Sequence, residues 1–244
     1  MGNSLKHKSE FEKLLINYKP NEDLLAILGK IKLALLVAPA ATGRNTIIRE
    51  LMKLGGYHYI VSDTTRKMRI NDGVMETNGV EYWFKDETVA LNDLSQGNYL
   101  GPAIIHNQQF SGINISEIQK SYADGKVAIT DIEIQGSEEI SEFKKDSLNI
   151  FVMPPSFDEW MRRLDGRGEM ENDEKKRRLK SAAHEIEEVI CSDNFMYVIN
   201  DDLDKAVKEI DDYIMDGKKT DTDLMRSHAS NILSALYSHP FWHS

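Results

Sequence analysis

The amino-acid sequence predicts an α/β protein in which a mostly parallel sheet is flanked by helices. Residues 32–37, 126–131 and 148–153 are short apolar runs without alternation, which is typical of strands buried on both faces of a parallel sheet. Segments with helical spacing lie between these runs. The repeated order of strand and helix therefore indicates βα units.

At the N-terminus, apolar side chains recur at spacings of three and four over residues 11–18 and predict an amphipathic helix that Lys19-Pro20 ends. A second short helix is expected over 23–28. The apolar run at 32–37 is expected to be a central strand. It leads into a turn at 38–45 and a helix whose apolar face spans 47–52 and which ends near Gly55-Gly56.

The rest of the chain continues this alternation. A polar segment at 63–79, with glycines and no period, is expected to be a flexible loop. The other expected elements are strands over 57–62, 80–84 and 197–200, charged helices within 157–190, a helix over 203–214, a polar link at 216–223, and a tail helix with its apolar face at 224–237.

Composition narrows the classes of function. The 244 residues suffice for one large domain or a core with inserted lobes. A net charge of −10 makes nucleic acid an unexpected general partner, because a polyphosphate would be repelled. Cys191 is the single cysteine, so no internal disulfide can form and a reducing compartment is expected. No apolar run is long enough to span a membrane, and the prediction is a cytoplasmic protein without a membrane partner.

The turn after the first central strand deserves comparison with a phosphate-binding loop. A loop of the form G-x-x-x-x-G-K-[ST] holds phosphate through backbone N–H groups and lysine, and its hydroxyl binds magnesium. Gly43 is retained here, but Ala38, Arg44 and Asn45 replace the first glycine, the lysine and the hydroxyl. Taken alone, the segment favours an ordinary βα connection. Its residues are Ala38, Pro39, Ala40, Ala41, Thr42, Gly43, Arg44, Asn45 and Thr46.

The order of further motifs over about residues 31–216 resembles the guanylate kinase family. The segment Ser62-Asp63-Thr64-Thr65-Arg66-Lys67-Met68-Arg69 is similar to the family's S-x-T-T-R-x-x-R. The segment Glu76-Thr77-Asn78-Gly79-Val80-Glu81-Tyr82-Trp83-Phe84 is similar to E-x-x-G-x-x-Y-x-F, and Asp131-Ile132-Glu133-Ile134-Gln135-Gly136 to D-x-D-x-Q-G. The series continues with 154–156, 163–164, 166–168, 178–179 and 200–203.

This resemblance implies the fold of a P-loop nucleoside-monophosphate kinase. The guanylate-kinase-like domain would span 31–217, with a monophosphate-binding lobe at 63–118 and a helical lid at 157–183. Residues 1–30 would be an N-terminal helical extension. Residues 218–244 would form a C-terminal helical tail that docks on its own core beside the N-terminal helices, or pairs with a second subunit as a homodimer instead of a monomer.

The resemblance also implies a site for the nucleoside monophosphate. Ser62, Arg66, Arg69 and Tyr82 match the residues that bind the monophosphate, and guanidinium and hydroxyl donors suit a dianionic phosphate. The segment between Arg69 and Gly79 is about four residues longer than usual in the family, which leaves the place of Tyr82 open.

Recognition of the base is less well preserved. Glu133 retains one carboxylate of a guanine site, because a carboxylate can accept guanine N–H groups. Gly101 stands where the family has a second carboxylate, and Phe110-Ser111-Gly112 stands where Y-G-[ST] is usual. Ser111 would replace the missing hydroxyl only if the register slips by one residue. Which base is accepted therefore stays open, with GMP the expected substrate.

For ATP, the resemblance implies binding by residues 38–46 and by Asn200 and Asp201, with Mg²⁺ bridging the phosphates and Asn45 as its protein ligand. The residues expected to neutralise the transferred phosphoryl group are Arg44, Arg163, Arg167 and Arg178, whereas Arg162 and Arg177 are their solvent-facing neighbours.

Two functions follow. The first is phosphoryl transfer from ATP to GMP or a related monophosphate, giving ADP and GDP, slowed by the altered loop. The second is a non-catalytic module that binds a nucleotide monophosphate or a phosphorylated partner. Ala38, Arg44 and Asn45 favour the module. The arginines of the expected lid favour the enzyme, because a binding module does not require them.

Overall fold

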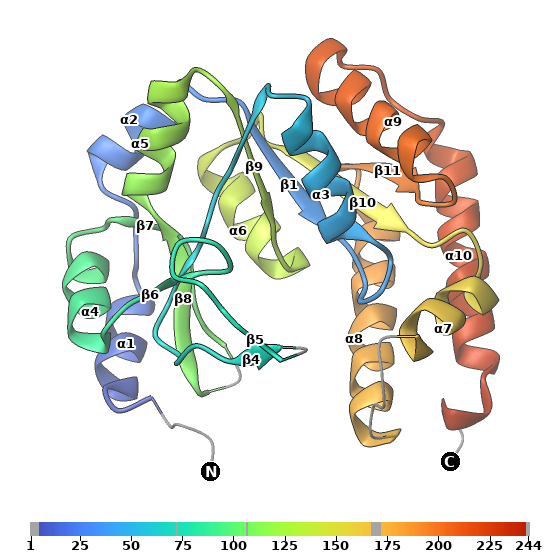
Figure 1. The fold of residues 1–244 in the computed structure, drawn as a ribbon, viewed down its shortest axis with the longest axis horizontal. Coiled ribbons are helices and arrows are strands. Elements are labelled where there is room, and N and C mark those ends of the chain that lie inside the picture. Colours follow the sequence, from blue (N-terminus) through green and yellow to red (C-terminus); the bar gives the residue numbers. More distant parts are fainter. Residues whose placement is uncertain (1–4, 72, 106, 167–171, 243–244) are drawn as a thin grey trace. The chain divides into compact units, whose positions relative to one another are not determined.

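The computed structural model describes residues 5–71, 73–105, 107–166 and 172–242. The chain divides into two compact units (Figure 1). The first contains residues 1–32, 58–128 and 139–146, and the second contains residues 33–57, 129–138 and 147–244. Each unit is described separately. No described helix is long and apolar enough to cross a membrane.

The central sheet has five strands in the order β11-β10-β1-β9-β2. Strand β10 pairs in parallel with β1 and with β11, which confirms the expected α/β class with a mostly parallel sheet. Every residue of β1 is buried, as its continuous apolar run predicts. The strand bounds are β1 Leu33–Val37, β2 Tyr57–Tyr59, β9 Val127–Asp131, β10 Leu148–Met153 and β11 Phe195–Ile199.

Helices of the second unit surround its part of this sheet. Helix α3 contacts α9, and α10 contacts α8, β11 and α7. Their bounds are α3 Arg44–Lys53, α7 Phe157–Asp165, α8 Asn172–Cys191, α9 Leu203–Asp216 and α10 Thr222–Ser238, followed by a 3₁₀ turn at Pro240–Trp242. Helix α6, Ile134–Phe143, is divided between the units.

The tail helix α10 packs against other elements of the second unit. Ala229, Ile232 and Leu236 are buried in a cluster with residues of α7 and α8. Its contacts are with α8, β11 and α7. Leu224 and Tyr237 are 62% and 39% exposed, so they lie outside the buried face.

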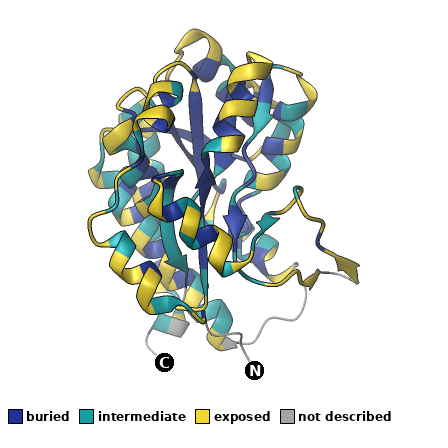
Figure 2. Ribbon diagram, turned by 90° about the vertical axis from the view of Figure 1, so that its left-hand side faces the viewer, coloured by how far each residue is buried: buried dark blue, intermediate teal, exposed yellow. Residues whose placement is uncertain are grey.

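The first unit contains a four-stranded sheet in the order β6-β3-β8-β7. Helix α1 packs against α4 and β7, and α2 packs against α5. Figure 2 shows buried residues along the strands and exposed residues on the outer faces of the helices. The elements are α1 Lys8–Leu15, α2 Glu22–Leu28, β3 Asp63–Thr64, β4 Ile70–Asn71, β5 Val74–Met75, β6 Trp83–Phe84, α4 Glu87–Ser95, β7 Tyr99–Ile105, β8 Gln109–Asn114 and α5 Ile115–Asp124.

Some boundaries differ from the sequence-based expectation. Residues 63–79 are more ordered than a flexible loop, because they contain β3 and the hairpin of β4 and β5. The strand expected over 80–84 is shortened to Trp83–Phe84. Gly79 has a left-handed φ of 82°, and its N–H donates to the carbonyl of Tyr82, so a turn precedes the strand.

Candidate nucleotide-binding site

The turn from β1 to α3 has the backbone of a loop that can hold an anion. Gly43 precedes the helix with φ 95°, and a Cβ there would lie 2.3 Å from Nδ2 of Asn200. Glycine is therefore required. Ala41 adopts φ 68°, a conformation that costs an alanine roughly 1–2 kcal/mol. The strained turn leads directly into α3, whose first N–H groups have no acceptor within the helix and can therefore bind an anion.

The carbonyl groups of the turn have donors from distant parts of the second unit. The indole Nε1 of Trp160 donates to the carbonyl of Ala40 at 2.8 Å. The amide of Asn200 donates to the carbonyl of Thr42 at 2.7 Å, and the Thr42 hydroxyl donates to the carbonyl of Pro39 at 2.9 Å. Asn200, expected to contact ATP, is 6% exposed and holds the loop, whereas Asp201 is exposed.

Arg44, which stands in the place of the loop lysine, binds a carboxylate at the end of β9. Its Nη2 lies 2.5 Å from Oδ2 of Asp131, and its Nη1 donates to the carbonyl of Ile132 at 3.4 Å. Both side chains are about one quarter exposed. Asn45 and Glu133 are exposed. Arg44 is therefore held beside the turn by an acidic partner that a phosphate would have to replace.

A second carboxylate, Glu185 on α8, interacts electrostatically with Arg44. Burial, followed by the charge of Glu133, raises the pKa of Glu185 on α8 to about 7, while the Arg44 cation opposes the shift. Oε2 of Glu185 is buried and has no hydrogen-bond partner among the described residues. Near neutral pH, the charge around Arg44 therefore changes with the protonation of Glu185.

The arginines of the expected lid are paired with glutamates on their own helices. Arg163 donates to Glu159 at 2.7 Å and to the carbonyl of Asn200 at 2.9 Å. Arg178 donates to Glu174 at 2.8 Å. Such pairs on a helix surface contribute little stability and can be exchanged for another anion. Arg167 lies outside the described residues.

In the first unit, Arg66 of the expected monophosphate clamp is paired with a buried carboxylate. Its Nη1 and Nη2 donate to the two oxygens of Glu76 at 2.5 and 2.7 Å. The hydrogen bonds to Glu76 raise the pKa of Arg66. The side chains of Arg66 and Glu76 are 10% and 5% exposed. The bidentate pair fixes the plane of the guanidinium, and Nη1 also donates to the carbonyl of Lys67 at 3.0 Å.

The other residues of the expected clamp make different contacts. The Tyr82 ring lies 4.8 Å from the guanidinium carbon of Arg66. The N–H of Arg69 donates to Glu76 at 2.8 Å, while its side chain is exposed. The carbonyl of Ser62 accepts from the N–H of Trp83. The longer segment before Gly79 contains the hairpin of β4 and β5, so it does not separate Tyr82 from Arg66.

Arg66 also lines a cavity of about 470 Å³ in the first unit. The other lining residues come from the N-terminal segment, the residues that flank Arg66, and the start of α4; they are Lys6, His7, Thr65, Lys67, Met68, Phe84, Lys85, Asp86, Glu87 and Thr88. Arg69 and Tyr82 are not part of this lining, so the cavity and the clamp share only the arginine.

Residues 110–112, which are expected to recognise the base, are largely buried. Phe110 is fully buried and stacks on Phe11 with ring centroids 4.7 Å apart. The Ser111 hydroxyl donates to the carbonyl of Asp63 at 2.7 Å. Gly101 has φ 57° and lies where the pairing of β7 with β8 shifts register. Gly101 itself has no side chain to offer in place of the carboxylate.

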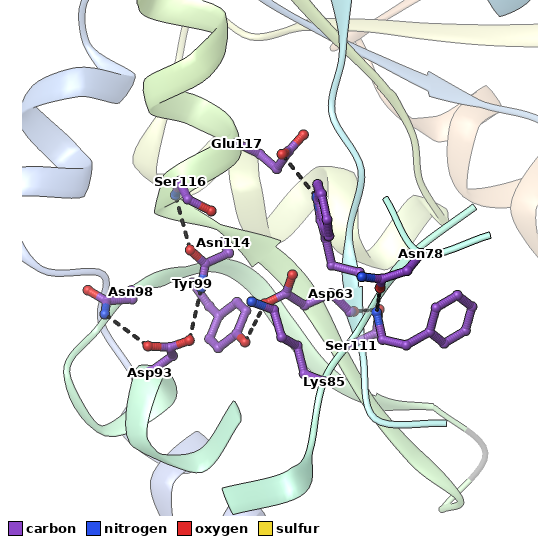
Figure 3. Close-up of polar contacts among 12 residues, drawn as sticks. Asp63, Asn78, Lys85, Asp93, Asn98, Tyr99, Ser111, Asn114, Ser116 and Glu117 are labelled. Carbon is purple, nitrogen blue, oxygen red and sulfur yellow. Dashed lines mark hydrogen bonds and ion pairs between the residues drawn. The ribbon is translucent and has the colours of Figure 1, made fainter. Parts of the chain in front are cut away.

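A buried polar network lies under this sheet (Figure 3). The Tyr99 hydroxyl donates to Oδ2 of Asp63 at 2.7 Å, and Nζ of Lys85 lies 4.0 Å from the same oxygen. Asp63 is 1% exposed, and its Oδ1 has no hydrogen-bond partner among the described residues. Burial raises the pKa of Asp63 to about 6. Asp63 is thus a titratable group inside the lobe.

The fold and the turn define a class of protein, a phosphate-binding α/β domain with a strand, a glycine-containing loop and a helix in sequence. The sequence profile described as guanylate kinase matches residues 30–217. The chain belongs to the guanylate kinase family.

Individual relatives agree with this membership. Guanylate kinase of Salinibacter ruber is 34% identical over 179 residues, which cover 72% of this chain and 92% of that protein. Guanylate kinase 1 of Arabidopsis thaliana is 34% identical over 175 residues, covering 70% of this chain and 44% of that protein. The chain spans about half the length of the plant relatives it matches. A solved guanylate kinase from Anaplasma phagocytophilum has a TM-score of 0.56 at 25% identity, covering 79% of this chain and 88% of that one.

Sequence reasoning did not assign three residues that organise the site. Glu76 was part of a quoted motif, and its charge beside two arginines was the signal that it would pair with one of them. No sequence pattern indicated that Trp160 would bind the loop, because a tryptophan on a helix is usually a core residue. Asp63 lies between matched residues at the start of a segment expected to be a loop, so no local pattern indicated its burial.

Proposed function

We propose that the chain transfers the γ-phosphoryl group of ATP to GMP, giving ADP and GDP. The observation that carries this proposal is the strained turn of residues 38–46, with φ 68° at Ala41 and φ 95° at Gly43, because such a turn supports phosphate binding by backbone N–H groups despite the substitutions at Ala38, Arg44 and Asn45. A module that only bound monophosphates would not need Ala41 at φ 68° or glycine at Gly43. Membership of the family and the pair of Arg66 with Glu76 support the same reaction.

In the proposed reaction, the protein acts by positioning and charge, without a covalent intermediate. Ser62, Arg66, Arg69 and Tyr82 bind the monophosphate of GMP. The loop N–H groups bind the ATP phosphates, and Arg44 exchanges Asp131 for them. Arg163 and Arg178 exchange their glutamates for the transferred group, and we propose the same role for Arg167.

Magnesium belongs to this proposal as the ion that neutralises the ATP phosphates. Mg²⁺ in phosphoryl-transfer sites uses one or two protein ligands and otherwise phosphates and water. The exposed amide oxygen of Asn45 fits that limited part, whereas Asp131 is bound to Arg44. No group of three or more metal-binding side chains occurs among the described residues, so we propose that the ion is held chiefly by ATP.

The sequence leaves open which base the substrate carries. We propose that GMP is accepted with less discrimination than a pocket with two carboxylates would give, because Gly101 offers no acceptor and Ser111 is bonded to Asp63. Glu133 remains as the carboxylate for the guanine N–H groups. We propose that the protein acts in the cytoplasm, as a monomer or homodimer.

The test is product analysis after incubation with ATP, Mg²⁺ and each of GMP, dGMP, AMP, CMP and UMP. GDP formed fastest, with a modest excess over the other diphosphates, is the expected result. Absence of every diphosphate, together with measurable GMP binding, would instead establish the non-catalytic module.

A further inference from the structure

We propose that Trp160 is a positioning residue for ATP, which sets the direction of the phosphate-binding N–H groups of the loop from a neighbouring helix. This inference rests on the proposed binding of ATP at residues 38–46. It concerns a residue outside every motif that matched the family.

The first step is the geometry of a peptide unit. In a trans peptide, the C=O of one residue and the N–H of the next point in opposite directions, because the unit is planar. A donor that fixes the carbonyl of Ala40 therefore also fixes the N–H of Ala41. Likewise, a donor on the carbonyl of Thr42 fixes the N–H of Gly43.

The second step is that both carbonyls have such donors. Nε1 of Trp160 lies 2.8 Å from the carbonyl oxygen of Ala40, and Nδ2 of Asn200 lies 2.7 Å from that of Thr42. Across the described part of the chain, the N–H groups of Ala41 and Gly43 have no protein acceptor. These two N–H groups are free to bind an anion, and their directions are set from outside the loop.

The third step is the rigidity of the donor. Trp160 is 1% exposed and contacts Phe157 edge to face, with ring centroids 6.2 Å apart. It belongs to the same buried cluster as Ala41 and Leu236. A donor packed this firmly holds one orientation, which an exposed side chain would not do.

The fourth step is a closed set of contacts. Arg163, three residues after Trp160 on α7, donates to the carbonyl of Asn200 at 2.9 Å. The side-chain amide of Asn200 in turn donates to the carbonyl of Thr42 in the loop. Helix α7, the end of β11 and the loop are thus joined by three hydrogen bonds. When Arg163 leaves Asn200 for a phosphate, Trp160 keeps α7 attached to the loop.

This arrangement suits a loop with altered chemistry. Arg44 is bound to Asp131, and Asn45 offers no hydroxyl, so the backbone N–H groups carry more of the phosphate binding than in a loop with lysine and serine. The orientation of these N–H groups therefore matters more for ATP binding. For Ala41, it depends on the hydrogen bond from Trp160 to the preceding carbonyl.

The test compares wild-type protein with Trp160→Phe, which keeps an aromatic ring in the cluster but removes the N–H donor together with the rest of the five-membered ring. Trp242→Phe is the matched control, because it makes the same chemical change at a tryptophan that packs against the same cluster. Steady-state transfer should show KM for ATP raised about threefold to tenfold in Trp160→Phe, the range of one lost hydrogen bond. KM for GMP and kcat should change less than about twofold, and the control should match wild type throughout.

Hydrogen exchange of the peptide covering residues 38–46, measured without nucleotide, separates this inference from the proposed function. Faster exchange in Trp160→Phe than in Trp242→Phe is expected. Equal exchange, or equal rises in the two KM values, would overturn the role of Trp160. If wild-type protein neither binds nor uses ATP, the proposed function fails, and exchange alone then decides whether Trp160 orients the loop.

Discussion

Arg44 and Asp131 form an ion pair at the start of α3, with Nη2 of the arginine 2.5 Å from Oδ2 of the carboxylate. The arginine that replaces the loop lysine is thus paired with a carboxylate of the protein itself. In the proposed reaction, ATP would compete with Asp131 for this cation. A lysine in the same place is a compact charge on a flexible stem, whereas arginine is a planar fork that matches a carboxylate closely.

Arg44→Ala should reduce kcat by about 100-fold to 1,000-fold, the usual effect of removing one group that stabilises charge in the transition state. Arg44→Lys combined with Asn45→Ser should raise kcat above wild type, because it restores the usual loop chemistry. Steady-state rates of GDP formation check both. Lys53→Ala, an exposed change at the other end of the same helix, is the control. If the double variant is no faster, the loop is not the slow element.

Arg66→Ala should weaken GMP binding by about 1.5–3 kcal/mol, the range for a lost hydrogen bond to a charged group. Titration calorimetry measures this. Since the change would also leave Glu76 buried without its partner, which is strongly destabilising, the test uses Arg66→Ala with Glu76→Gln. Lys67→Ala, at an exposed neighbour, is the control and should bind GMP as wild type does. Equal affinity in all three proteins would remove the clamp assignment.

Asp63 should make stability depend on pH in a direction opposite to most carboxylates. Burial raises its pKa from 3.8 to about 6, so the folded protein holds the proton more tightly than the unfolded chain. Its contribution is full below pH 3.8 and is lost as pH rises through 6. Between pH 5 and 7.5, the free energy of unfolding should fall by about 1 kcal/mol more in wild type than in Asp63→Asn. Urea unfolding at the two pH values measures it, and a constant difference would contradict the assignment.

Leu236 should anchor the tail helix. The side chain is fully buried, and Leu236→Ala should lower the free energy of unfolding by about 2–5 kcal/mol. Leu224→Ala, at a position 62% exposed on the same helix, should change it by less than about 0.5 kcal/mol. Thermal unfolding compares the two variants. A larger loss at Leu224, appearing only at concentrations where the chain self-associates, would indicate that the exposed face pairs with a second subunit.

The parts of this molecule that the sequence predicted well are those set by local chemistry. The unbroken apolar run of β1 requires burial on both faces, and Gly43 was recognised as the retained glycine of the loop. The class of fold and the family followed from such local signals.

The contacts that complete the site depend on residues distant in sequence, which no local pattern reports. Trp160 reaches Ala40 across 120 positions, and Asn200 reaches Thr42 across 158. Whether Arg44 would contact phosphate or Asp131 depends on the end of another strand, and the hairpin within 70–75 was masked by the polar character of its segment.

The most direct test of the central claim is transfer of label from γ-³²P-ATP to GMP by wild-type protein and by the Arg66→Ala, Glu76→Gln variant, purified identically and assayed with Mg²⁺. The variant controls for contaminating kinases, since it differs only in the clamp. We predict labelled GDP from wild type and a rate at least about tenfold lower from the variant at subsaturating GMP. Labelled GDP at equal rates from both proteins, or from neither, would contradict the account.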